Sequence, residues 1–187
     1  MHADAGREER APEAGFTVRM RVFAVSGSLQ SGSSNTRLVH VARDLAPDGI
    51  DVDVFESVGA LPHFNPDLVA PRAVVDLRER VAASDGVLIA SPEYAHEMPG
   101  SLKNALDWLV GSGELYGKRA AVVVVSPRPN GGVYAREAIE RTLRAQGAEV
   151  VVSITLGVVK HEVAADAAFL DQARDTVDEL FAALAFT

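Results

Sequence analysis

The chain lacks several features that mark other classes of protein. It contains no cysteine, which excludes disulfides, thiolate metal sites and thiol chemistry. Basic residues are in the minority, with 18 Lys and Arg against 26 Asp and Glu, so the net charge is −8. That balance argues against nucleic acid or an anionic membrane surface as a partner. No apolar run approaches the roughly 20 residues of a membrane span, and no apolar signal segment follows the N-terminus. We therefore expect a cytoplasmic protein that binds small molecules.

The length of 187 residues is enough for one domain with a substantial core. Residues 1–16 are rich in Ala, Gly, Glu and Arg and show no apolar periodicity, so we expect a mobile N-terminal tail. Residues 17–187 are predicted to form a single domain. Neither His96 nor His161 has a second histidine at metal-binding spacing, so no metal site is expected.

Apolar patterns alternate between strands and helices along the rest of the chain. Strands are predicted over 19–26, 50–55, 86–90, 120–125 and 149–154, and helices over 35–46, 71–84, 101–110, 133–146 and 166–185. Five such repeats favour a parallel α/β sheet with right-handed crossovers. In the order 2-1-3-4-5, the strand over 50–55 lies at an edge, where Asp51 and Asp53 would face solvent. The loops after the first, third and fourth strands then meet at the carboxyl edge, where such sheets bind ligands.

The turn after the first strand is rich in Gly, Ser and Asn and leads directly into a helix. Such a turn offers backbone N–H groups, hydroxyls and the helix dipole to an anion. It is not a mononucleotide P-loop, because Gly32 is followed by two serines, and it lacks the middle glycine of a dinucleotide fingerprint. Glu56 is either a ribose-binding acid or a solvated loop residue. The turn is either a neutral phosphate cradle, suited to a phosphomonoester such as FMN, or an ordinary turn with N-cap serines.

Two motifs resemble the NAD(P)H-dependent FMN reductase family, which includes quinone, chromate and azo-dye reductases. After the first strand, residues 27–35 read G-S-L-Q-S-G-S-S-N, similar to the family's G-S-x-R-x-x-S-x-N. After the third strand, residues 92–108 read P-E-Y-A-H-E-M-P-G-S-L-K-N-A-L-D-W, similar to P-E-Y-N-x-x-x-P-G-x-L-K-N-A-x-D-W. The second motif is long and specific. The resemblance implies a flavodoxin-like three-layer sandwich with helices on both faces of the sheet.

The resemblance also implies which residues bind FMN. The phosphate would be bound by Ser28, Gln30, Ser33, Ser34, Asn35 and Thr36. The ring and ribityl chain would lie along Pro92, Glu93, Tyr94 and Ala95, with the loop containing Ser126 and Gly131 on the other side. His96 and Arg128 are candidate contacts for the substrate, and Arg128 also for the 2′-phosphate of NADPH. No catalytic side chain is expected, because the flavin itself carries the chemistry.

The implied activity is a ping-pong reaction in which NADPH or NADH reduces FMN, which then reduces a second acceptor. The acceptor would be a flat molecule (a quinone, azo dye or flavin) or a metal oxyanion, and the enzyme a homodimer or homotetramer. One alternative is a flavodoxin-like electron carrier or non-catalytic flavin-binding module. Another is a protein of this fold that has lost flavin.

Two positions depart from the family motifs. Gln30 replaces an Arg, so a phosphate loses a charge-assisted bidentate partner. Ala95 replaces an Asn and removes a polar side chain that we expect beside the flavin. Arg37, just beyond the turn, is either a substitute cation or a solvated helix residue. Trp108 is either a core residue or part of a dimer interface.

Overall fold

Five parallel strands form one sheet in the order β2-β1-β3-β4-β5. The computed structural model describes residues 19–128, 131–157 and 167–185. The strands are β1 (Met20–Ser26), β2 (Ile50–Phe55), β3 (Gly86–Ser91), β4 (Arg119–Ser126) and β5 (Glu149–Gly157). This order confirms the predicted topology. The tail expected over 1–16 lies outside the described residues.

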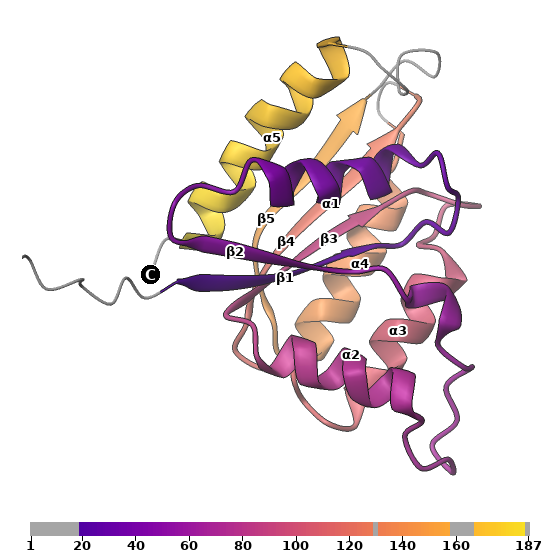
Figure 1. Ribbon diagram of the computed structural model, residues 1–187. Helices are drawn as coiled ribbons and strands as arrows, with labels where there is room; N and C mark the ends of the chain where they lie inside the picture. The colour runs from indigo at the N-terminus through magenta and orange to yellow at the C-terminus, as the bar shows by residue number, and fades with distance from the viewer. Residues whose placement is uncertain (1–18, 129–130, 158–166, 186–187) are drawn as a thin grey trace, which may run out of the picture.

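Helices cover both faces of the sheet, which confirms the flavodoxin-like three-layer sandwich (Figure 1). α1 (Ser34–Asp44) and α5 (Ala167–Ala185) lie on one face. α2 (Arg72–Ala82), α3 (Gly100–Val110) and α4 (Val133–Ala145) lie on the other. A short 3₁₀ turn, η1 (Val58–Ala60), was not predicted, because three residues give no periodicity. β5 is three residues longer than predicted, and Pro71 is the N-cap of α2 rather than its first-turn residue.

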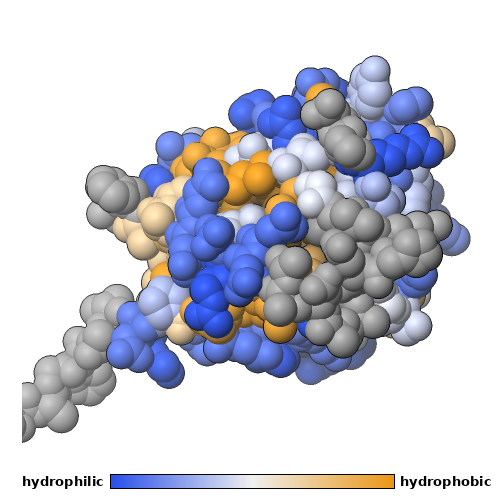
Figure 2. Space-filling model, turned by 90° about the horizontal axis from the view of Figure 1, so that it is seen from above, coloured by the Kyte–Doolittle hydropathy of each residue, from blue (hydrophilic) through white to orange (hydrophobic). Residues whose placement is uncertain are grey.

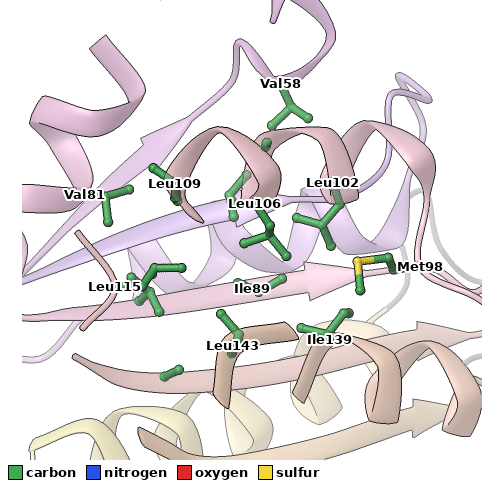
Figure 3. Close-up of a cluster of buried hydrophobic side chains, with 14 of the residues drawn as sticks. Val58, Val81, Ile89, Met98, Leu102, Leu106, Leu109, Leu115, Ile139 and Leu143 are labelled. Carbon is green, nitrogen blue, oxygen red and sulfur yellow. The ribbon is translucent and has the colours of Figure 1, made fainter. Parts of the chain in front are cut away.

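The apolar runs of the central strands are buried on both faces. All six residues of β3 are buried, as expected for a parallel strand between two helix layers. Figure 3 shows Leu102, Leu106 and Leu109 of α3 lying over the sheet near Ile89, with Leu143 of α4 in the same cluster. Burial of each such side chain stabilises the fold by about 1.5–3 kcal/mol.

Trp108 belongs to this core and fixes the loop that follows η1. Its ring is 2% exposed, and its Nε1 donates to the Pro62 carbonyl at 2.8 Å. Asn104, one turn earlier on α3, donates to the same carbonyl at 3.0 Å and accepts from the Phe64 N–H at 2.7 Å. Two polar residues of the second sequence motif are therefore structural, and they hold the connection between β2 and α2.

Asp53 on the edge strand β2 is not simply solvated, which corrects the sequence interpretation. Asp51 is exposed, but the Asp53 carboxylate accepts from Nε of Arg80 at 2.9 Å. The hydrogen bond from Arg80 lowers the pKa of Asp53. The pattern of alternating acids located the sheet edge correctly, but it could not show that α2 supplies a partner to one of them.

The face formed by α1 and α5 is mainly hydrophilic, with apolar atoms visible between the hydrophilic side chains (Figure 2). Both helices direct their apolar residues inward, among them Leu38, Val39, Val177 and Leu180, which are fully buried. Within the described parts of the chain, every helix is too short or too polar to traverse a lipid bilayer.

Candidate functional site

A pocket of about 410 Å³ lies at the carboxyl edge of the sheet, between the loops that follow β1, β3 and β4. Its volume is typical of small-molecule sites. The structure brings most of the predicted binding residues into this one pocket. The lining residues are Ser28, Gln30, Gly32, Ser33, Ser34, Asn35, Pro92, Glu93, Tyr94, Val125, Ser126 and Pro127.

One end of the pocket is formed by the turn into α1, and we call it the phosphate end (residues 28–35). Ser33 is the N-cap of α1, and its hydroxyl accepts from the Thr36 N–H at 3.5 Å. Within the described residues, the backbone N–H groups of Gly32, Ser34 and Asn35 donate to no protein acceptor. N–H groups in this position carry the positive end of the helix dipole. These donors and the neighbouring hydroxyls fit a phosphate group.

The phosphate end contains no cationic side chain. Gln30 is exposed and lines the pocket, but among the described residues around it there is no Lys or Arg. The guanidinium of Arg37 lies 5.0 Å from the ring of Phe169 on α5, and Arg37 is not among the lining residues. A bound phosphate would therefore be held by neutral hydrogen bonds and the dipole of α1.

Asn35 joins the phosphate end to β4, although 90 residues separate it from Val125. Its Oδ1 accepts from the Val125 N–H at 3.0 Å, and its Nδ2 donates to the Val125 carbonyl at 3.3 Å. The side chain is 3% exposed and uses one N–H and its acceptor within the protein. The backbone N–H of Asn35 and the second N–H of its side-chain amide are left for the predicted contact with phosphate.

A second connection links Gly27, directly before the phosphate end, to α3 and β3. The Ser101 hydroxyl at the start of α3 donates to the Gly27 carbonyl at 3.1 Å, and the Gly27 N–H donates to the Ala90 carbonyl at 2.8 Å. A Cβ at position 27 would lie 2.7 Å from Oγ of Ser91, so a larger residue there would force the buried Ser91 side chain to move.

The other end of the pocket is formed by Pro92, Glu93 and Tyr94, which we call the ring end, and it leads into a tight turn over residues 94–97. The Tyr94 N–H donates to the Glu97 carbonyl and the Glu97 N–H donates back to Tyr94, both at 3.0 Å. The residues between them, Ala95 and His96, have φ values of 51° and 62°. Positive φ at both central residues is typical of a type I′ turn, which favours Asn at the first of them. Position 95, where the family motif has Asn, therefore has a role in the turn as well as the predicted place beside the flavin.

The loop after β4 closes the remaining side of the pocket. Ser126 is buried and lines it, while Pro127 and Arg128 are exposed. Gly131 packs against the Ser126 hydroxyl so closely that a Cβ there would collide with it. Residues 129 and 130 of this loop lie outside the described residues.

Not every predicted residue reaches the pocket. Gly32, Val125 and Pro127 line it without having been singled out, whereas Thr36, Ala95, His96, Arg128 and Gly131 do not line it. Gly32 and Pro127 lie inside loops that were predicted to form the site, so their position was a usable signal. Val125 reads as one more apolar strand residue, and nothing in the sequence marks its contact with the site.

Thr36 and Glu56 line a second cavity, of about 550 Å³, between the turn after β1, α1, the end of β2 and η1. This cavity shares Ser28 and Gln30 with the pocket. There His40 Nε2 lies 3.7 Å from a Glu56 carboxylate oxygen. Glu56 therefore does not reach the pocket at the carboxyl edge, and the sequence hypothesis of a ribose-binding acid gains no support from its placement.

Comparisons with known proteins agree with this geometry. The family model described as NADPH-dependent FMN reductase matches residues 20–162. An NAD(P)H-dependent FMN reductase from Pseudomonas aeruginosa is 36% identical over 129 residues, which cover 66% of this chain and 69% of that protein. A quinone reductase from Pseudomonas putida is 38% identical over 130 residues, or 65% and 68% of the two chains. The structure of the flavoenzyme FerB, an NAD(P)H:(acceptor) oxidoreductase from Paracoccus denitrificans, superimposes with a TM-score of 0.67 and 29% identity, covering 86% of this chain and 98% of that one.

Proposed function

The chain belongs to the NADPH-dependent FMN reductase family, and we propose that it uses FMN to pass electrons from NAD(P)H to a flat acceptor such as a quinone. One observation carries this proposal. Unpaired N–H groups at the start of α1 and an exposed aromatic turn occur at opposite ends of one pocket at the carboxyl edge. The electron-carrier alternative is not favoured, since the relatives are named as reductases.

We infer the roles of the residues from their places in the pocket. The N–H groups of Gly32, Ser34 and Asn35, with the hydroxyls of Ser28 and Ser33, would hold the FMN phosphate. Pro92, Glu93 and Tyr94 would lie beside the ring, with Ser126 and Pro127 across the pocket.

FMN, when bound, supplies the redox chemistry by accepting a hydride and passing on electrons. The protein's part is to bind the cofactor and to leave room for its two partners in turn. Tyr94 is 52% exposed, so the ring end is open to solvent and to exchanging ligands. His96 and Arg128 are exposed near this opening and are proposed as contacts for the acceptor or for NAD(P)H.

We also propose that residues 17–187 form a single FMN-binding domain and that the protein is a homodimer or homotetramer. Exposed apolar residues support self-association: Phe64 and Leu68, which are 39% and 50% exposed, line one surface hollow, and Val69 and Val110 are 93% and 59% exposed. Phe64 packs edge-on against Trp108 at 5.1 Å between ring centroids. Light scattering on the purified protein measures the mass, and a monomer at micromolar concentration contradicts this part. A cytoplasmic location is proposed because NAD(P)H is an intracellular electron donor.

The test of the function uses one sample. The protein is purified with added FMN, its flavin absorbance is recorded, and NADH or NADPH is added without oxygen. We expect rapid bleaching, followed by recovery of the absorbance when a benzoquinone is added. Flavin that stays oxidised would support the electron carrier, and a protein that retains no flavin at high FMN concentration would contradict both functions.

A further inference from the structure

We propose that Glu93 is a positioning residue, whose carboxylate joins the loop after β3 to the first turn of α4 and so fixes the width of the ring end. The inference rests on the proposed function, because the ring end matters only if FMN binds there. It assigns the Glu93 side chain a role beyond the place beside the ring that the family motif implies.

The contact itself is a helix cap supplied from another segment. One carboxylate oxygen of Glu93, Oε2, accepts from the N–H groups of Tyr134 and Ala135 at 3.0 and 3.1 Å. The N-cap residue of α4 is Gly132, which has no side chain to accept these bonds. Glu93 is 41 residues away along the chain from Tyr134, and its side chain is only 16% exposed. An anion at a helix N-terminus also interacts favourably with the helix dipole.

Two weaker contacts run along the same face of α4. The second oxygen of Glu93 lies 3.6 Å from Nδ1 of His96, whose ring meets that of Tyr134 edge-on at 4.6 Å. Glu97 lies 3.7 Å from the guanidinium of Arg141. Both partners of the Glu97 pair are more than half exposed, and pairs of this kind contribute little. Glu93 is therefore the strongest attachment of this loop to α4.

The Glu93 contact completes a set of three connections among the loops that form the pocket. Asn35 joins the first loop to the end of β4, and Ser101 joins it to the start of α3. Glu93 supplies the third connection, between the loop after β3 and the helix that follows the loop after β4. These two loops face each other across the ring end, so their separation depends on this side chain.

The strained turn next to Glu93 makes this support necessary. Left-handed backbone costs about 1–2 kcal/mol for a residue that is not glycine, and both Ala95 and His96 adopt it. Within the described residues, the backbone N–H groups of these two residues donate to no protein acceptor. The contact of Glu93 with α4 attaches the chain directly before this turn.

The test compares Glu93→Ala, Glu93→Gln and the matched control Glu97→Gln, which neutralises a carboxylate of the same loop outside the pocket. FMN affinity is measured by fluorescence quenching, the bound flavin by its absorbance spectrum, and the amides of Tyr134 and Ala135 by hydrogen exchange in the protein without flavin. We expect Glu93→Ala to weaken FMN binding about tenfold, to shift the spectrum toward that of free FMN and to speed exchange at both amides. Glu93→Gln keeps one acceptor oxygen, so each of these effects should be smaller in that variant. The FMN affinity of Glu97→Gln should lie within twofold of the wild-type value.

The outcomes separate this inference from the proposed function. FMN affinity and spectrum equal to wild type in Glu93→Ala, with faster amide exchange, would show a purely structural cap and overturn the inference while leaving the function intact. If Glu93→Ala does not fold, the Glu93→Gln variant decides the question. A Glu93→Gln protein with the FMN affinity and the flavin spectrum of the wild type would then overturn the inference. A wild-type protein that binds no FMN overturns both.

Discussion

The two ends of the pocket differ in how they are built into the fold. At the phosphate end, Ser28 and Ser33 are each 8% exposed and Asn35 is 3% exposed, although the residues between Ser28 and Ser33 are exposed. At the ring end, Tyr94 is 52% exposed and the next three residues are also exposed. The first end is anchored in the sheet through Asn35, whereas the second leads into a strained turn and is attached to α4 through Glu93.

This difference matches the demands that the two ends would meet. A cofactor phosphate stays in place through many reaction cycles, so its donors gain from being fixed before binding. A flavin ring must admit two flat partners in turn, so its surroundings must stay open. The phosphate end is pre-organised but has no charged side chain. The ring end is accessible, and the turn beside it has two residues in the unfavourable left-handed conformation.

The largest expected effect comes from cutting the anchor of the phosphate end. Asn35→Leu keeps a similar volume but leaves both backbone groups of Val125 without their partner. A buried polar group left unpaired costs about 1–3 kcal/mol, so we expect a loss of about 2–4 kcal/mol in the free energy of unfolding, measured with urea. The matched change is His96→Asn, in the turn beside the ring end. Asn tolerates the positive φ of residue 96, so the free energy of unfolding of this variant should lie within about 0.5 kcal/mol of the wild-type value. Equal losses in the two variants would contradict the contrast.

An intermediate effect is expected from giving the phosphate end a cation. Gln30→Arg introduces a charge-assisted donor in the pocket, and we expect FMN to bind about five- to tenfold more tightly. The gain should shrink at high salt, because position 30 is exposed.

Two controls identify the source of that gain. Riboflavin, which has no phosphate, should bind both proteins equally well. Ser31→Arg adds the same charge to the neighbouring residue, which lines the second cavity but not the pocket, and should change FMN affinity less than twofold. Tighter riboflavin binding in Gln30→Arg would place the effect away from the phosphate.

The smallest effect concerns the turn beside the ring end. Ala95→Asn places a residue that tolerates left-handed backbone where φ is 51°, so we expect the free energy of unfolding to rise by about 0.5–1 kcal/mol. Ala95→Val should lower it, since a β-branched side chain resists this conformation. Both are measured by thermal unfolding of the protein without flavin. The same change in melting temperature for Asn and Val would show that the backbone of residue 95 is not under strain in solution.

Much of the fold could be predicted because it is encoded locally. The apolar runs of the strands and the Gly- and Ser-rich turn identified the element order, and topology rules then placed three loops together. Most of the pocket's lining followed from that placement. Thr36 was an exception, because its side chain faces a cavity on the other side of the same turn.

The sequence by itself determined where the strands, helices and binding loops lie, because periodicity and turn composition act over a few residues. The tertiary structure alone decided which polar groups meet. It paired Asn35 with Val125 and Glu93 with the start of α4, and it directed Glu56 away from the pocket. It also revealed that position 95 is a left-handed turn residue. Such pairings join segments dozens of residues apart, and they depend on packing that no local pattern records.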